Sequence, residues 1–240
     1  MTKAKYIRKV LVVLFAIICS VSIAGQASAQ IIMPLDVEIS GADMPNGSTP
    51  WVTATFIDVS TDNVRLTMSA SNLTGVEFIN QWYFNSLVTS GLTFTAYDIS
   101  AIYDPTISLA SNSYQADGDG LFDIKFDFSN VDDGSRFEAG ETVIYDISGT
   151  GISASTFNTQ SFTGGGAGTY TSAAQIGGIT VSDPGNVDCN AIDNSDYPDC
   201  GSGWIANTTV TVVPEPISST LFIVGGATLG FRRFRKKFNK

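Results

Sequence analysis

The chain has 240 residues and a formal net charge of −10 at neutral pH, and it contains no histidine. A chain of this length can bury the core of one medium-sized domain or of two small ones. Without histidine it cannot build a Ser-His-Asp or Cys-His catalytic site, or a histidine-ligated zinc or iron centre.

The first 29 residues have the pattern of a secretory signal peptide. Four cations precede the apolar run 10–24, and the small-x-small sequence Ala27-Ser28-Ala29 follows it, just before Gln30. These are the three parts of a signal that signal peptidase removes. We therefore expect residues 1–29 to be cleaved and the mature chain to begin at Gln30, with an uncleaved membrane anchor as the alternative.

The middle of the chain is strongly acidic. Between Asp36 and Asp199 there are 22 acidic residues and only three cations, Arg65, Lys125 and Arg136, which gives this span a formal net charge of −19. A nucleic-acid-binding surface has to be basic in order to neutralise phosphates. Nucleic acid is therefore excluded as a partner, whereas divalent cations remain compatible with such a surface.

Period-two alternation of apolar and polar residues recurs between about residues 35 and 213. Turn sequences rich in Gly, Asn and Asp separate the alternating segments, and no apolar period of 3.6 residues lasts for three turns. The expected strands are 35–40, 51–60, 64–73, 76–84, 92–100, 106–113, 121–128, 141–149 and 204–213. Many strands with short connections predict an all-β domain over 30–213, an antiparallel β-sandwich of jelly-roll or immunoglobulin-like type.

The clearest alternation is LFDIKFDF at 121–128. It predicts that Phe122, Ile124, Phe126 and Phe128 share one face of a half-buried strand, with Asp123, Lys125 and Asp127 on the other. Immediately before it, DGDG at 117–120 predicts a tight turn in which the glycines supply positive φ angles.

The span 161–203 is rich in Gly, Ser, Ala and Asp and contains one strand-like island at 170–181. Two interpretations stay open, a mobile loop and a loop ordered by a disulfide or an ion. Cys189 and Cys200 are the only cysteines that remain after removal of the signal. In the oxidising compartment outside the cytoplasm such a pair usually forms a disulfide, so we expect a bond between them.

Calcium is the only cofactor that the sequence suggests, and two acidic groups could hold it. One is Asp117 and Asp119 in the DGDG turn, although Leu121 and Phe122 stand where an EF-hand loop needs an oxygen ligand and a glycine. The other surrounds the cysteines and consists of Asp188, Asp193, Asp196 and Asp199. For both groups the alternative is a turn or loop without a metal.

Aromatic residues offer a possible sugar-stacking face. The candidates are Trp51, Trp82, Tyr83, Tyr97, Tyr103 and Trp204. On alternating strands at least half of them should be core, and the adjacent Trp82 and Tyr83 must point to opposite sides. A glycosidase-like pair of carboxylates is the remaining route to an enzyme, but no spacing singles out such a pair, so we expect no catalytic residues and no enzyme.

The C-terminal segment 214–240 differs from the rest of the chain. It starts with Pro214-Glu215-Pro216, continues with the apolar run 217–231 and ends in a basic cluster that begins with Arg232 and Arg233. As a helix the 15-residue run would measure about 22 Å, which is short of the roughly 30 Å hydrocarbon thickness of a bilayer. Cations behind it would stay on the cytoplasmic side. We expect a short hydrophobic helix that anchors the chain in the inner membrane transiently, with a permanent anchor as the alternative.

These three features, in this order, resemble the PEP-CTERM sorting signal of Gram-negative bacteria that make exopolysaccharide. The resemblance covers residues 213–240 and implies recognition by exosortase, a membrane-embedded protease-transpeptidase that removes the tail near Pro-Glu-Pro. It also implies an exported protein of the cell envelope, outer surface or extracellular matrix. We expect a structural or adhesive role in an exopolysaccharide-rich biofilm; the alternative is a carbohydrate-binding module, with or without calcium.

Overall fold

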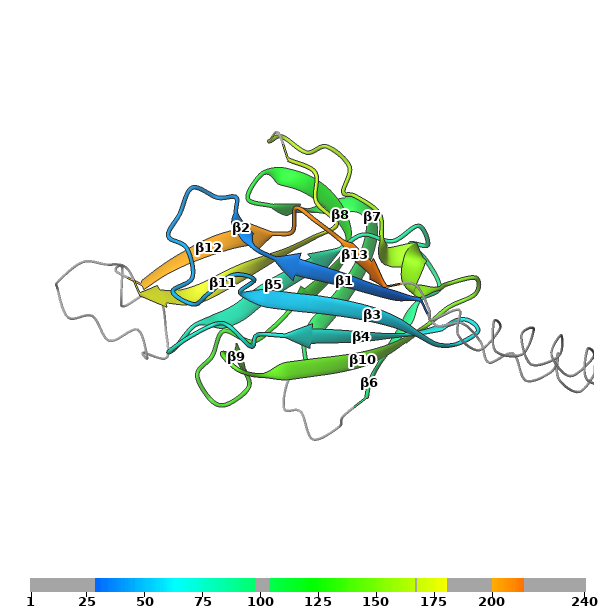
Figure 1. Cartoon of the computed structure of the whole chain (residues 1–240), viewed down its shortest axis with the longest axis horizontal. Coiled ribbons are helices and arrows are strands. Elements are labelled where there is room, and N and C mark those ends of the chain that lie inside the picture. Colours follow the sequence, from blue (N-terminus) through cyan, green and yellow to red (C-terminus); the bar gives the residue numbers. More distant parts are fainter. Residues whose placement is uncertain (1–28, 98–103, 167, 181–199, 214–240) are drawn as a thin grey trace, which may run out of the picture. The chain divides into compact units, whose positions relative to one another are not determined.

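The computed structural model describes residues 29–97, 104–166, 168–180 and 200–213. These residues belong to one compact unit, Ser28–Val213. Within them the secondary structure is almost entirely β (Figure 1). The elements are β1 (Gln30–Leu35), β2 (Val37–Glu38), β3 (Val52–Ser60), β4 (Asn63–Ser69), β5 (Phe78–Phe84), β6 (Thr93–Ala96), β7 (Thr106–Ala116), β8 (Asp119–Asp127), β9 (Phe137–Glu138), β10 (Thr142–Ser148), the 3-10 helix η1 (Ala154–Phe157), β11 (Ser172–Thr180), β12 (Cys200–Ala206) and β13 (Thr211–Val213).

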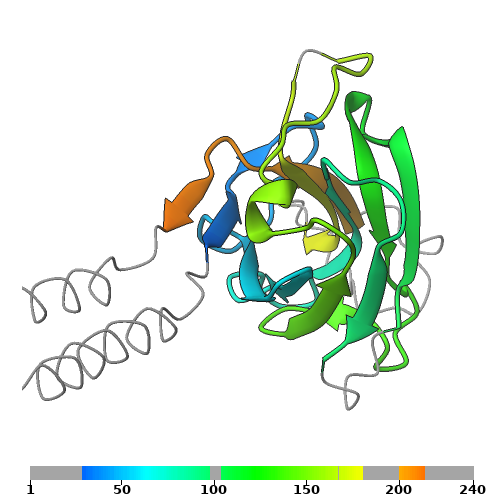
Figure 2. The same cartoon turned by 90° about the vertical axis from the view of Figure 1, so that its right-hand side faces the viewer.

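The strands form two sheets. The first sheet has the order β13-β1-β3-β4-β10-β6, and the second has the order β2-β12-β11-β5-β8-β7, with β9 paired to β5. Every pairing between these strands is antiparallel. Figures 1 and 2 show the unit from two sides, with β1, β3, β4 and β10 lying over the strands of the second sheet. The prediction of an all-β protein built from antiparallel sheets is therefore confirmed.

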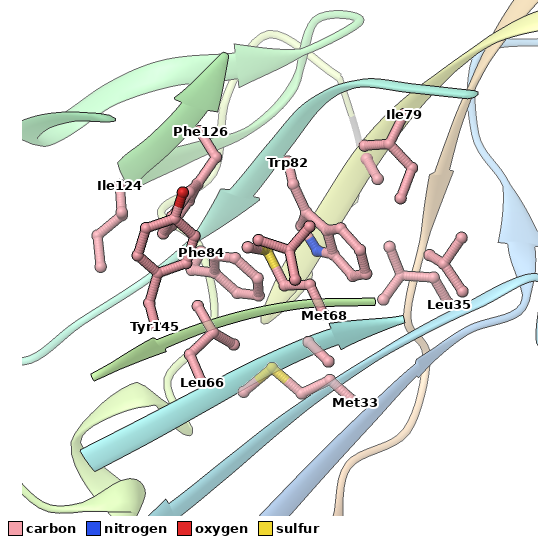
Figure 3. Close-up of a cluster of buried hydrophobic side chains, with 14 of the residues drawn as sticks. Met33, Leu35, Leu66, Met68, Ile79, Trp82, Phe84, Ile124, Phe126 and Tyr145 are labelled. Atoms are coloured by element: carbon pink, nitrogen blue, oxygen red, sulfur yellow. The ribbon is translucent and has the colours of Figure 1, made fainter. Parts of the chain in front are cut away.

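The main hydrophobic core lies between the two sheets. Alternate residues of β3 and β4, among them Phe56, Leu66 and Met68, are fully buried against Trp82, Phe84 and Phe126 of the second sheet. Figure 3 shows side chains from both sheets meeting in this layer. Removal of such apolar surface from water, at about 25 cal/mol per Å², is the main favourable term that holds the sheets together.

Strand β8 follows the predicted alternation only in part. Ile124, Phe126 and Phe128 lie in the core between the sheets, as expected, but Phe122 packs in a second cluster together with Tyr83. The reason is a bulge in β7: Leu109 pairs with Ile124, yet the next pair is Tyr114 with Phe122. The extra β7 residues bend the end of this hairpin, so the side chain of Phe122 joins a different layer.

The strands differ from the expected ones at two places, since the expected strand 35–40 is reduced to the end of β1 and to β2. The segment 30–35 forms β1, which the alternation did not single out because Ile32 and Pro34, the half-buried residues between its buried ones, are apolar as well. The expected strand 204–213 is divided into β12 in the second sheet and β13 in the first. Asn207 lies at the division, where its side chain accepts a hydrogen bond from Ser172 N and donates one to Thr209 O.

The strand-like island within 161–203 is confirmed as β11, which lies inside the second sheet between β12 and β5. The hairpin turn before β8 is confirmed too, since Asp117, Gly118 and Gly120 all have positive φ angles. Across the described part of the chain, no helix has the length and apolar character needed to cross a membrane.

Candidate functional site

All of the predicted sorting residues, and most of the predicted disulfide and calcium residues, lie outside the described part of the chain. This holds for Pro214, Glu215, Pro216, Arg232 and Arg233, for the expected hydrophobic helix, and for Cys189, Asp188, Asp193, Asp196 and Asp199. Cys200 is the first residue of β12, and its backbone pairs with Thr180 at the end of β11. The Cys189–Cys200 disulfide therefore remains a prediction.

The acidic turn before β8 contacts a glycine-rich segment of the chain. Asp119 Oδ1 accepts a hydrogen bond of 3.3 Å from Gly168 N, and Gly118 O accepts one of 2.7 Å from Gly166 N. A Cβ atom on Gly166 would lie 1.5 Å from Asp119 Oδ1, so a larger residue there would displace the Asp119 side chain from its present position. Asp119, one of the two calcium candidates in this turn, thus accepts a hydrogen bond from the backbone of a neighbouring loop.

Asp117 is exposed, and within the described ranges no group of three His, Cys, Asp or Glu residues is arranged to hold a metal ion. Calcium binding remains a prediction for both acidic groups, and the residues of the second, at 188–199, lie outside those ranges.

The predicted aromatic residues do not form one platform. Trp82 lies in the core between the sheets, and Trp51 is buried there as well. Tyr97 is 54% exposed and follows β6 of the first sheet, with the guanidinium carbon of Arg65 3.5 Å from its ring centroid. Tyr103 lies outside the described residues.

Tyr83 and Trp204 come together on the face of the second sheet that points away from the first. They belong to a cluster separate from the core that contains Trp82, which confirms that Trp82 and Tyr83 point to opposite sides. Their ring centroids are 5.0 Å apart, and Tyr83 also contacts Tyr114 at 6.0 Å and Phe122 at 5.7 Å. The end of the β7–β8 hairpin contributes Tyr114, Ala116 and Phe122 to this second cluster.

A row of polar side chains adjoins this cluster. The pairing of β5 with β8 places Gln81 opposite Asp127, and its pairing with β11 places Gln81 opposite Gln175. We call the outer strip the set consisting of Gln81, Tyr83, Tyr114, Lys125, Asp127, Gln175 and Trp204.

Hydrogen bonds run along the outer strip from one side chain to the next. Tyr83 donates its hydroxyl hydrogen to Gln81 Oε1 at 2.5 Å, and Gln81 Nε2 donates to Asp127 Oδ1 at 3.0 Å. Lys125 Nζ then donates to Asp127 Oδ2 at 2.9 Å. At the other end, Gln175 Oε1 accepts a bond of 3.0 Å from Asn80 Nδ2. The part of the strip formed by Tyr83, Gln81, Asp127 and Lys125 is therefore held in one arrangement before any ligand arrives.

The phenol of Tyr83 keeps its proton over an unusually wide pH range. Burial raises its pKa to about 12, and the negative charge of Asp127 and the neighbouring Tyr114 act in the same direction. Burial together with the charge of Asp104 raises the pKa of Tyr145, in the core, to about 12 as well. A protonated Tyr83 is the form that can donate to Gln81.

We expect the free energy of unfolding to fall as the pH rises from 10 to 12, because the phenols of Tyr83 and Tyr145 ionise near pH 10 in the unfolded chain and near 12 in the folded one. In that window the unfolded state binds fewer protons, so alkali favours it, while below pH 10 the stabilisation is complete. Urea unfolding across this range measures the slope, and Tyr83→Phe should reduce it. An equal slope in the variant would contradict the assignment to Tyr83.

Two buried carboxylates serve as structural anchors. Glu77 is 1% exposed and accepts hydrogen bonds from the backbone N–H groups of Asn46 and Thr74. Asp123 is 6% exposed and accepts hydrogen bonds from Ser86 N and Asn112 N. The bond from Asn112 holds the bulge of β7 in place. Asp123 was expected on the polar face of β8. It is buried instead, because the bulge brings backbone N–H groups to it that need an acceptor.

Sequence reasoning singled out Tyr83 and Trp204 as candidates. It missed their neighbours Gln81, Tyr114, Lys125 and Asp127. The signal in the sequence was the alternation of side chains along each strand. On β8, Lys125 and Asp127 alternate with core residues and so face away from the core. On β5, Gln81 and Tyr83 flank the core residue Trp82 and face the same way. What the sequence does not show is that β5 and β8 are neighbours.

Comparison of the chain with protein-family models, curated proteins and solved structures found no match.

Proposed function

We propose that the chain is an exported protein of the cell envelope or extracellular matrix of a Gram-negative bacterium, and that exosortase sorts and processes it. In this proposal its β domain has a structural or adhesive role in an exopolysaccharide-rich biofilm. The observation that carries the proposal is the ordered tail: Pro214-Glu215-Pro216, an apolar run and then a basic cluster beginning at Arg232.

The position of the domain supports the two proposed cuts. The compact unit is Ser28–Val213, so the cut after Ala29 and the cut near Pro214 both fall at its boundaries. Gln30 in β1 pairs directly with Val213 in β13. Signal peptidase and exosortase could therefore remove both end segments without cutting through a strand, and the two new termini would emerge side by side on the first sheet.

In this proposal the domain is a jelly-roll or immunoglobulin-like sandwich without enzymatic activity. The absence of histidine and the structural use of Glu77 and Asp123 support this interpretation. Its partners would be signal peptidase, exosortase, the inner membrane before processing, and matrix polysaccharide afterwards. In this proposal calcium would bind at the acidic residues around Cys189 and Cys200 or at Asp117 and Asp119.

Replacing Glu215 with alanine, or deleting residues 232–240, is expected to leave a larger species in the membrane fraction of the native host. The first change alters the motif proposed for recognition, and the second removes the cations that would hold the tail on the cytoplasmic side. Intact mass spectrometry of the fractionated protein measures both effects. Asp43→Ala, at an exposed position of the domain, is the matched control and should mature normally. Normal maturation of both tail variants would refute the sorting proposal.

A second candidate function, binding of carbohydrate, is favoured by the outer strip. There, side chains that donate and accept hydrogen bonds adjoin a half-buried tyrosine, Tyr114. This combination suits ligands that carry both apolar C–H surface and hydroxyl groups.

A further inference from the structure

The outer strip offers hydrogen-bonding groups of both kinds within a small area. Asp127 is an acceptor, Lys125 is a donor, and the amide of Gln81 is both. The side chain of Lys125 is 22% exposed and that of Asp127 is 36% exposed, so both can reach a ligand. A sugar hydroxyl group donates one hydrogen bond and accepts others, and this mixed set of partners matches it.

The aromatic residues give these polar groups a rigid base. Tyr83 is 5% exposed and Trp204 is 9% exposed, so neither presents a free ring to a ligand. Tyr114 packs against this base but remains only partly buried, with Lys125 Nζ 5.9 Å from its ring centroid. Tyr114 is therefore the aromatic side chain of the strip that can contact the apolar C–H face of a sugar ring.

Little ordering is needed when a ligand binds here. Gln81 is already fixed between Tyr83 and Asp127, and Asp127 fixes Lys125 in turn. Binding to a surface with free side chains costs conformational entropy for each side chain that becomes ordered, and a preformed network avoids most of that cost.

The charge of the domain selects among saccharides. The span from Asp36 to Asp199 carries a formal net charge of −19, and Lys125, the cation of the strip, is already paired with Asp127. A polysaccharide that carries carboxylates or sulfates would be repelled by this field. An uncharged saccharide meets no such barrier.

We propose that the outer strip binds an uncharged saccharide, with one sugar ring against Tyr114 and its hydroxyl groups bonded to Gln81, Lys125 and Asp127. This inference rests on the second candidate function and gives it a site and a class of ligand. It does not depend on sorting by exosortase, because the groups that carry it belong to the folded domain.

Isothermal titration of the full chain, kept in mild detergent, against hexasaccharides of glucose, mannose and xylose and an anionic hexamer of uronic acid tests the proposal. We expect at least one neutral hexasaccharide to bind, and the uronic acid hexamer to bind more weakly. Tyr114→Ala and Gln81→Ala should each raise the Kd about tenfold, as the loss of one good contact or hydrogen bond does.

Tyr97→Ala is the matched control, since it removes an exposed aromatic ring that belongs to the first sheet. It should leave the Kd within about twofold, a change near the size of RT in free energy. Tyr114→Phe keeps the ring and should bind like the unmodified chain, which separates a lost contact from a lost fold.

Three results would overturn the proposal: no binding of any neutral hexasaccharide, a preference for the anionic hexamer, or equal weakening by Tyr97→Ala and Tyr114→Ala. A failure of this kind with normal tail processing in the host would count against the strip alone. Saccharide binding by a chain whose tail is not processed would count against sorting alone.

Discussion

Replacing Trp82 with alanine is expected to lower the free energy of unfolding by about 3–5 kcal/mol. The indole is fully buried between the sheets, where it stacks on Phe84 and Phe137 with ring centroids 5.8 and 6.4 Å away. Its Nε1–H also donates to Ser172 Oγ at 2.8 Å. Figure 3 shows it among side chains of both sheets. Such side chains relax only partly after a large-to-small substitution, so a cavity would remain. The change removes apolar burial, ring contacts and a hydrogen bond together.

Urea unfolding followed by circular dichroism measures this loss, and thermal unfolding should show a midpoint lowered by roughly 10 °C. Phe162→Ala is the control, because this ring is 63% exposed and its backbone bonds to Leu121 survive the change. The control should shift stability by no more than about 0.5 kcal/mol. Similar losses in both variants would show that Trp82 does not lie in the core.

Replacing Glu77 with alanine is expected to cost about 3 kcal/mol, a large effect for a single polar side chain. Its carboxylate accepts bonds of 2.6 Å from Asn46 N, 3.1 Å from Asn46 Nδ2 and 2.7 Å from Thr74 N. Hydrogen bonds to a charged group contribute about 1.5–3 kcal/mol each, and donors left unpaired beside a buried site lose solvation as well. The loop at Asn46 and the turn at Thr74 would lose their common acceptor.

Glu38→Ala is the matched control for Glu77→Ala. The Glu38 carboxylate likewise accepts several backbone bonds, from Ser40 N, Gly41 N and Ala42 N, but the turn is half-buried or exposed, so water can replace the carboxylate. We expect a loss of about 1 kcal/mol or less. Urea unfolding of the two variants side by side makes the comparison, and equal losses would refute the role of burial.

Local patterns predicted the class of fold well. Alternation placed Ile124, Phe126 and Phe128 in the core, since successive side chains of a strand point to opposite faces. The turn at Asp117 and Gly118 followed from residue types that tolerate positive φ angles. Such patterns failed where one strand departs from regular pairing, as at Phe122, because the bulge that displaces it is in β7.

The outer strip could be predicted only in fragments. Tyr83 and Trp204 were candidates by residue type, although 121 positions separate them in the sequence. They meet because β11 lies between β5 and β12, and Gln81 meets Asp127 because β8 lies on the other side of β5. Strand order of this kind depends on contacts between distant segments, and no local pattern encodes it.

The sequence by itself determined that this chain folds into antiparallel sheets, where its main turns lie and which residues of each regular strand face inward. It also supplied the whole case for an exported protein with a removable tail. The tertiary structure alone decided that Glu77 and Asp123 are buried anchors, and that a hydrogen-bonded strip lies outside the second sheet. The physical reason is range: alternation and turn preferences act over a few residues, whereas burial and register are set by strands that are distant in the chain.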